Sequence, residues 1–359
     1  MRILYVTPRI IGEGGLVRVL SIKANYFADV FGHEVHILTQ NDNHIDPFYH
    51  FSEAITFHNM QLTGNRVRFL KQYIQSVKAL IAKIQPDLVV VCDGLKGFFI
   101  PIFIQTEIPI LFESHGSIFN TESKPRLSMF YNLGIKFKKY AASKFDKFIV
   151  LSEESQSEWQ VSNSVVIPNP NWLSNVTVSD LSNKKVLVVA RHSYEKGIDR
   201  LLEVWNLVAQ KHPDWILEVY GSFEDNYYQK QAQQLGLTSI HFYQPVSNIE
   251  EQYSQSSMLL MTSRYEGFPM VLIEAMTFGL PCVAFDCPCG PRAIIENNET
   301  GFLIEDHNIQ SYADKVIQLI EDRELALKMS ANAVKLASQY DLETIMTTWN
   351  ELLKSLMNK

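Results

Sequence analysis

The sequence lacks the long apolar runs that membrane-spanning helices require. No stretch approaches about 18 consecutive apolar residues, and the N-terminal "MRILYVTPRI" has a strand pattern with no apolar signal-peptide core behind it. We therefore expect neither a transmembrane helix nor a signal peptide, and we expect a cytoplasmic protein.

Cysteine is also scarce, and basic residues are fewer than acidic ones. The last three of the four cysteines cluster, but they form no CxxC pair and have no nearby histidine, so we interpret all four as reduced structural thiols rather than a metal site. They are Cys92, Cys282, Cys287 and Cys289. The net charge of −7 argues against nucleic acid as a partner.

What is present indicates a globular protein of two domains. The chain has 359 residues, of which 46% are hydrophobic and 20% charged. This length exceeds one ordinary hydrophobic core, so we expect two domains of about 150 to 180 residues.

Short apolar runs alternate with helical patterns along both halves of the chain, which predicts parallel sheets covered by helices on both faces. In the first half the strand-like runs are 2–8, 34–40, 87–93, 109–114 and 147–152, with helices over 16–31 and 66–84. In the second half they are 184–190, 215–221, 239–244, 257–263 and 281–286.

The predicted fold class is therefore α/β, with two Rossmann-like, doubly wound domains facing across a cleft. A linker rich in Pro and Asn lies near 165–182, so we place the N-terminal domain at 1–167 and the C-terminal domain at 168–340. We interpret the final helix, 341–357, as crossing back onto the first domain. Ligands of such sheets bind beyond the carboxyl ends of the strands.

Two carboxylates stand eight positions apart in "SRYEGFPMVLIEAM", just after a predicted strand. Glu266 falls in the loop, while Glu274 falls inside a short apolar helix that Pro269 opens and Gly279 ends. A buried carboxylate needs hydrogen-bond donors. Ribose hydroxyls would supply them, and an internal Arg or a helix N-terminus would serve equally well.

A second strand is followed by the loop "RHSYEKG", which carries two cations. The planar fork of Arg191 and the point charge of Lys196 suit a diphosphate and would stabilise it as a leaving group. Solvated loop cations are the other interpretation.

These segments together resemble retaining glycosyltransferases of the family 4 type. "EGFPMVLIE" resembles their E-x7-E motif and "ARHSYEKG" their Arg-x4-Lys loop. "EGGLVRVL" is similar to their Gly-Gly loop, "ESHG" to their His-Gly after a strand, and "FDCPCGPRAIIENNETGFLI" to the segment that follows E-x7-E. The resemblance spans both domains and implies the GT-B architecture.

The resemblance implies a role for each matching residue. Glu274 would bind the ribose, its missing partners arriving with the nucleotide, and Glu266 would hydrogen-bond the donor sugar. Arg191 and Lys196 would neutralise the diphosphate, so no metal or other cofactor is needed, and the chain contains no Asp-x-Asp pair.

The remaining implied contacts surround the same ligand. His115 would contact the sugar, although an isolated histidine is also a common structural residue. The backbone of Gly14 and Gly15 would approach the phosphates. The E-x7-E segment would add further contacts from Gly267, Phe268, Met270 and Val271. Pro269 replaces the Gly of many relatives and removes one N–H donor beside the sugar.

The implied reaction moves a hexose or N-acetylhexosamine from a UDP-sugar to a hydroxyl of a saccharide or polyprenyl-linked saccharide in cell-surface glycan biosynthesis, with retention. A GDP-sugar donor stays open, as does a nucleotide-sugar-binding protein without transfer activity. A 2-epimerase would need other acid and base residues, and "IGEGGLVRVL" does not complete the G-x-G-x-x-G pattern of an oxidoreductase.

Two basic segments of the N-terminal domain concern the acceptor. Residues 124–147 hold seven Lys or Arg against one Asp, and residues 65–83 hold five basic and no acidic residues. Such faces suit an anionic membrane surface, and with it a peripheral location on the inner face of the cytoplasmic membrane. A solvated face with aromatic side chains packed on the sheet is the alternative.

Overall fold

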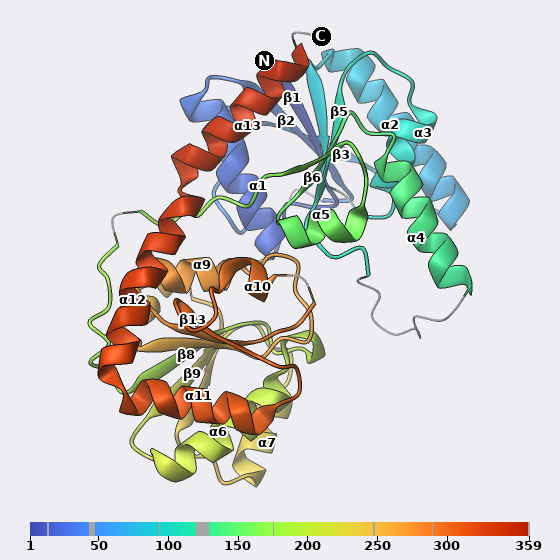
Figure 1. Cartoon of the computed structure of the whole chain (residues 1–359). Helices are drawn as coiled ribbons and strands as arrows, with labels where there is room; N and C mark the ends of the chain where they lie inside the picture. Colours follow the sequence, from blue (N-terminus) through green and yellow to red (C-terminus); the bar gives the residue numbers. More distant parts are fainter. Residues whose placement is uncertain are drawn as a thin grey trace. The chain divides into compact units, whose positions relative to one another are not determined.

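The chain folds into two α/β units. The computed structural model describes residues 1–12, 14–42, 47–92, 94–119, 129–174, 176–246, 248–288 and 290–357. Unit 1 comprises Met1–Pro170 and Leu342–Lys359, and unit 2 comprises Asn171–Asp341 (Figure 1). Each unit contains one sheet in which every strand pairing is parallel, and this confirms the predicted fold class.

Unit 1 has a seven-stranded sheet in the order β3-β2-β1-β4-β5-β6-β7. The strands are β1 Arg2–Val6, β2 Glu34–Gln40, β3 Thr56–Met60, β4 Leu88–Val91, β5 Ile110–Ser114, β6 Lys147–Val150 and β7 Ser164–Val166. The helices are α1 Gly15–Asn25, α2 Arg66–Ile84, α3 Ile100–Phe103, α4 Met129–Ala142, α5 Glu153–Trp159 and α13 Leu342–Met357. A π-helical turn, Tyr26–Val30, extends α1, and a 3₁₀ turn, Gly97–Phe99, precedes α3.

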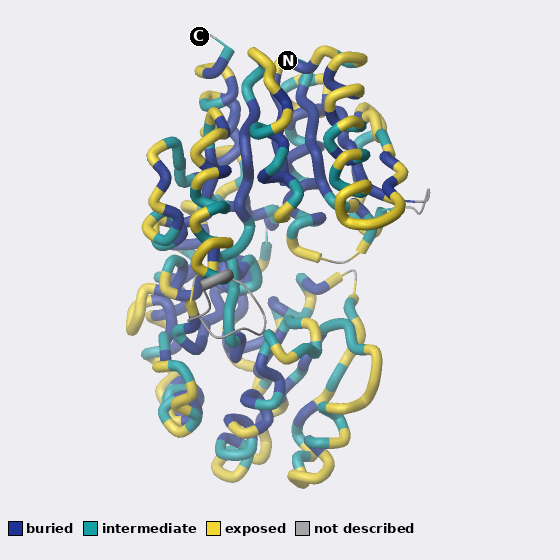
Figure 2. The backbone as a smooth tube through the Cα atoms, turned by 90° about the vertical axis from the view of Figure 1, so that its right-hand side faces the viewer, coloured by how far each residue is buried: buried dark blue, intermediate teal, exposed yellow. Residues whose placement is uncertain are grey.

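Alternating side chains of β1 pack into two separate hydrophobic cores, one on each face of the sheet. Leu4 and Val6 join the core on one face of the sheet, and Ile3 and Tyr5 join the other. This is the two-residue period of a strand buried on both faces. Helix α2 covers the first face, while α1 and α13 cover the second, and Figure 2 shows the strands of this unit in the buried colour.

The C-terminal helix α13 is an integral part of unit 1. Its apolar side, including Met346 and Trp349, packs into the same core as α1. Asn350 Oδ1 also accepts a hydrogen bond from His33 Nε2 at 3.1 Å. The chain thus leaves unit 1 near Pro170, forms unit 2 and returns at Leu342.

Unit 2 has a six-stranded sheet in the order β10-β9-β8-β11-β12-β13. The strands are β8 Lys185–Val189, β9 Ile216–Tyr220, β10 Ile240–Tyr243, β11 Met258–Met261, β12 Cys282–Phe285 and β13 Gly301–Ile304. The helices are α6 Ile198–Lys211, α7 Tyr227–Gln234, α8 Ile249–Ser254, α9 Met270–Thr277, α10 Pro291–Ile294, α11 Ile309–Glu321 and α12 Arg323–Ala337, with 3₁₀ turns at Tyr194–Lys196 and Ser338–Tyr340.

Three strands were absent from the sequence prediction. Strand β3 lies at a sheet edge and exposes most of its side chains, so it lacks the apolar pattern of the others. Strands β7 and β13 span only three and four residues. The predicted helix over 16–31 is also shorter, because its last part is the π-helical turn.

Candidate active site

The point where the strand order reverses lies between β8 and β11 in unit 2. The chain runs from β8 outward to β10, and then crosses to β11 on the other side of β8. Ligand sites of doubly wound sheets lie at such a reversal, beyond the carboxyl ends of the strands. The loops that leave these two strands carry Lys196 and Glu266, so the structure places both predicted residues at the expected position.

Lys196 and Glu266 contact each other directly. The Lys196 ammonium donates to both oxygens of the Glu266 carboxylate, at 2.7 and 2.9 Å. The Lys196 side chain is 25% exposed and that of Glu266 is 10% exposed. The pair is therefore partly desolvated, which strengthens its attraction, yet it remains partly exposed to solvent.

Arg264 connects the loop after β11 with the segment that follows β8. Its guanidinium donates to both oxygens of Asp199, at 2.9 and 2.5 Å, and its backbone N–H donates to Glu195 O at 2.8 Å. Burial alone would raise the pKa of Asp199, but the hydrogen bonds from Arg264 lower it below the ordinary value. The guanidinium also stacks 3.9 Å from the centre of the Tyr194 ring.

Two glycines allow the close approach of these loops. Gly197 has a φ of +64°, and a Cβ there would lie 2.1 Å from the carbonyl oxygen of Thr262. Gly290 has a φ of +123°, and a Cβ there would lie 2.6 Å from Pro269 and 3.2 Å from Cβ of Glu266. Only glycine fits both the backbone conformation and the space.

Glu274 is buried, as predicted, but its expected lack of protein partners is wrong. The residue is 2% exposed, and its two oxygens accept hydrogen bonds at 2.9 Å from the Trp172 indole and the Tyr253 hydroxyl. Neither an arginine nor a helix N-terminus supplies these donors. The buried charge is therefore satisfied by the protein itself, and the proposed ribose contact must share or displace one of these bonds.

Arg191 stands apart from the Lys196 and Glu266 pair. Its side chain is exposed, and the structure gives it no side-chain partner among the described residues. Gly221 fixes the start of its loop, because a Cβ at Gly221 would lie 1.8 Å from Ala190 O. Within the described part of the chain, Arg191 is thus an unpaired cation at the same end of the sheet.

His192 is a residue that the sequence analysis passed over. Its ring stacks on Phe223 at a centroid distance of 4.8 Å and meets Phe242 edge-on. Neither ring nitrogen has a hydrogen-bond partner among the described residues. Burial lowers the pKa of His192 to about 4, so the ring is neutral at physiological pH.

The remaining E-x7-E residues surround the start of α9. Phe268 is 8% exposed and packs edge-on against Tyr340 at 5.8 Å. Gly267, Met270 and Val271 are partly exposed. Phe268 therefore serves the core of unit 2 more than the site surface.

In unit 1, the predicted glycines border open space. A Cβ at Gly14 or Gly15 would meet no atom within 4 Å; Gly14 is the N-cap of α1 and Gly15 is its first residue. His115 follows β5, and its Nε2 lies 3.1 Å from Glu113 Oε2. The Glu113 carboxylate also accepts from the buried ammonium of Lys23.

This histidine also belongs to a group of metal-binding residue types. Ligand atoms of Cys92, Glu113 and His115 all lie within 4.8 Å of one another. The Lys23 ammonium already neutralises Glu113, so a divalent ion would have to bind next to a buried positive charge. The three described cysteines are free thiols, and Cys289 lies outside the described residues.

The sequence pattern that singled out Glu274 could also have predicted that Lys23 and Glu113 are buried and paired. Each is a charged residue within an apolar stretch, Lys23 in "VLSIKANYF" and Glu113 in "PILFES". Charged residues at such positions are buried only with a partner.

The basic segments of unit 1 are partly exposed. All five basic residues of α2 are exposed: Arg66, Arg68, Lys71, Lys78 and Lys83. In α4, Lys138 donates to Ile118 O and Lys139 to Gln160, and Phe145, which follows this helix, packs in the core. Residues 124–128 lie outside the described residues. Within the described chain, no helix has both the length and the hydrophobicity that crossing a membrane requires.

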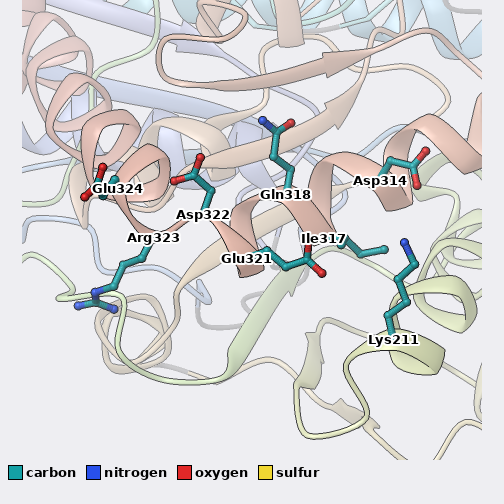
Figure 3. A pocket seen from close by; sticks show the side chains of 8 residues that line it. All are labelled: Lys211, Asp314, Ile317, Gln318, Glu321, Asp322, Arg323 and Glu324. Carbon is teal, nitrogen blue, oxygen red and sulfur yellow. The ribbon is translucent and has the colours of Figure 1, made fainter.

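Unit 2 also has a hollow that none of the predicted site residues lines. It has a volume of about 660 Å³ between the end of α6, α11 and the start of α12 (Figure 3). Its charged side chains are four acids against one Lys and one Arg, which does not suit an anionic ligand. The lining residues are Lys211, Asp314, Ile317, Gln318, Glu321, Asp322, Arg323 and Glu324.

Comparison with known proteins covers both units. The family model described as "Glycosyl transferases group 1" matches residues 173–336, and that described as "Glycosyltransferase Family 4" matches residues 13–170. An uncharacterized glycosyltransferase of Haemophilus influenzae is 32% identical over 95% of this chain and 96% of its own length. The amylovoran biosynthesis glycosyltransferase AmsD of Erwinia amylovora is 25% identical over 98% of this chain and 99% of its own.

Solved structures share the fold. A TarM mutant of S. aureus, in complex with fondaparinux, alpha-GlcNAc-glycerol and UDP, superposes with a TM-score of 0.82 at 17% identity, covering 100% of both chains. Anabaena HepE in complex with UDP-glucose superposes with a TM-score of 0.78 at 20% identity, over 99% of this chain and 100% of its own.

Two parallel-sheet units of this kind are the architecture of the GT-B fold. The chain belongs to the group 1 glycosyltransferases, of the family 4 type.

Proposed function

We propose that the chain transfers a hexose or N-acetylhexosamine from a UDP-sugar to a hydroxyl of a saccharide or lipid-linked saccharide, with retention of anomeric configuration. The observation that carries this proposal is the contact of Lys196 with Glu266 where the strand order of unit 2 reverses. It joins a cation suited to a diphosphate to a carboxylate suited to sugar hydroxyls.

The relatives support the choice of donor and pathway. AmsD is named for amylovoran biosynthesis, and the TarM and HepE structures contain UDP or UDP-glucose. We infer from these that a UDP-sugar is the donor and that the product belongs to a cell-surface polysaccharide or related glycan.

In the proposed reaction, positively charged side chains replace a divalent metal. Lys196 and the exposed Arg191 would bind the diphosphate, and Glu266 would orient the sugar. When the donor binds, the Lys196 ammonium would be shared between Glu266 and a phosphate oxygen, which keeps all three groups in one network.

The chemical step would proceed on one face of the sugar. The bond between the anomeric carbon and the diphosphate oxygen breaks, and the acceptor oxygen forms its bond on the same side. The leaving phosphate takes the acceptor proton, so no separate protein nucleophile is required. Catalysis would then rest on positioning and on stabilisation of the leaving diphosphate.

We also propose that unit 1 binds the acceptor at an anionic membrane surface. The five exposed cations of α2 support this, together with the exposed apolar side chains Phe103, Leu133 and Tyr140 of α3 and α4. Basic and aromatic groups on one unit suit lipid headgroups and the boundary with the acyl chains.

Slow hydrolysis of the donor tests the proposed reaction without a known acceptor. UDP-glucose and UDP-N-acetylglucosamine would each be incubated with the protein and EDTA, and the released sugar followed by proton NMR. We expect UDP and the α-anomer to appear first, before mutarotation. Initial release of the β-anomer would exclude retention, and binding without turnover would favour a regulatory protein.

A further inference from the structure

Next to His115 lies the buried ion pair of Lys23 and Glu113, which has no role in the reaction proposed above. Glu113 Oε2 accepts from the Lys23 ammonium and lies 3.1 Å from His115 Nε2. The side chains of Lys23 and Glu113 are 2% and 1% exposed, whereas that of His115 is 17% exposed. His115 is therefore the member of the three that solvent or a ligand reaches.

Three elements enclose this pair. Lys23 lies on α1, Glu113 on β5, and the ring of Trp349 on α13 covers the ammonium at 4.2 Å. Burial alone would raise the pKa of Glu113, but the Lys23 charge and the hydrogen bond with His115 lower it to about 2. The carboxylate is thus ionised over the physiological range.

An ionised carboxylate can only accept hydrogen bonds. The nitrogen of His115 that faces it, Nε2, must therefore carry a proton. In the neutral imidazole the other nitrogen, Nδ1, then has a free lone pair, because among the described residues His115 makes its side-chain hydrogen bond through Nε2, to Glu113.

The pair is poorly explained as a device for stability. Burying two charges costs desolvation, and apolar side chains of similar volume often stabilise a core as well or better. Glu113 Oε1 is also buried without a hydrogen-bond partner among the described residues. A pair retained for stability alone would satisfy both oxygens.

We propose that Lys23 and Glu113 are positioning residues that hold His115 in the Nε2-protonated form and leave Nδ1 to accept a hydrogen bond from a sugar hydroxyl. The identity of that hydroxyl rests on the proposed function, whereas the tautomer of His115 does not. Lys23 prevents Glu113 from taking up the proton, and Glu113 fixes the ring.

The test replaces both charges together. Lys23→Met/Glu113→Gln keeps the side-chain volumes and avoids leaving one buried charge alone. The matched control is Lys185→Met/Glu218→Gln in unit 2, which removes an ion pair of 2.6 Å whose side chains are 17% and 15% exposed. Both proteins are compared with wild type by long-range proton–nitrogen NMR of labelled histidine, with His115→Gln used for assignment.

We expect wild-type His115 and the control to show only the Nε2-protonated tautomer. The Lys23→Met/Glu113→Gln variant should show a mixture, because the amide that replaces the carboxylate can donate as well as accept. Its kcat for hydrolysis of UDP-N-acetylglucosamine should fall roughly 10- to 100-fold with little change in KM, a range that we take from partners that orient metal-binding histidines.

Several results would overturn this assignment. An Nδ1-protonated His115 in the wild type would do so even if the double variant failed to fold. An unchanged tautomer and kcat in a folded double variant would show that the pair does not position His115. If the wild type hydrolysed no UDP-sugar, the proposed function would fail, while the NMR result would still decide the role of the pair.

Discussion

The Lys196 ammonium lies 2.7 and 2.9 Å from the two carboxylate oxygens of Glu266. These residues are 70 positions apart and belong to the two motifs on which the family resemblance rests. Their contact brings the two motifs together, and removal of either side chain would leave the charge of the other without this partner.

Lys196→Ala and Glu266→Gln should each lower the turnover of a UDP-sugar about 100-fold or more, since they remove leaving-group stabilisation or sugar orientation. Initial rates of UDP release would measure this, and circular dichroism would show that the fold is retained. Lys184→Ala removes an exposed ion pair with Asp214 and serves as the control. Near wild-type rates for both site variants would contradict the assignment.

Gly197→Ala should destabilise unit 2 by about 2 to 5 kcal/mol and displace Lys196. Its positive φ strains any other residue, and the added Cβ would collide with Thr262 O. Gly236→Ala is the matched control, because Gly236 has a φ of +69° but no atom within 4 Å of an added Cβ. It should cost only about 1 to 2 kcal/mol in urea unfolding. If Gly197→Ala and Gly236→Ala lowered the free energy of unfolding equally, the close approach of Gly197 to Thr262 O would be unimportant for stability.

Glu274→Ala should lose the rise in melting temperature that UDP gives, because it removes the proposed ribose contact. It should also lower stability, since the Trp172 and Tyr253 donors lose their acceptor. Tyr253→Phe separates the two effects: it should cost about 1 to 3 kcal/mol and retain the UDP shift. A full UDP shift in Glu274→Ala would exclude the ribose role.

His192 should make the protein less stable in mild acid. Its pKa is about 4 in the folded protein and near the ordinary value of about 6.5 when unfolded. As pH falls through this window, the unfolded chain binds a proton that the folded chain does not, so stability is lost. His192→Leu should therefore lose less stability than wild type between about pH 7 and pH 5 in urea unfolding. If both proteins lost the same stability over this pH range, His192 would not be a buried, neutral ring in the folded protein.

Charge reversal on α2 tests the membrane proposal. Lys71→Glu/Lys78→Glu should abolish flotation with phosphatidylglycerol vesicles at low salt, since each basic residue contributes roughly 1 kcal/mol near an anionic surface. Lys328→Glu/Lys335→Glu makes the same change in net charge on α12. Equal loss in both variants would indicate a net-charge effect, and no flotation of wild type would exclude this contact.

The sequence sufficed to predict the two sheets apart from the edge strands β3, β7 and β13. It also sufficed to predict the positions of Lys196 and Glu266, because both residues lie in loops that follow buried apolar strands. It did not predict that they pair, since that depends on β8 lying beside β11. The sequence also could not predict the partners of Glu274, because Trp172 and Tyr253 lie 102 and 21 positions from it along the chain. Contacts of this kind are set by tertiary packing, which leaves no local pattern.

The most direct test of the account is UDP binding in EDTA, measured by thermal shift on wild type and Lys196→Ala, because a ligand that binds only the folded state raises the melting temperature. We expect a clear rise for wild type with UDP, little with GDP or ADP, and a much smaller rise for Lys196→Ala. No shift with any nucleotide, a shift only after metal is added, or an unchanged shift in Lys196→Ala would contradict a metal-independent UDP-sugar site at Lys196 and Glu266.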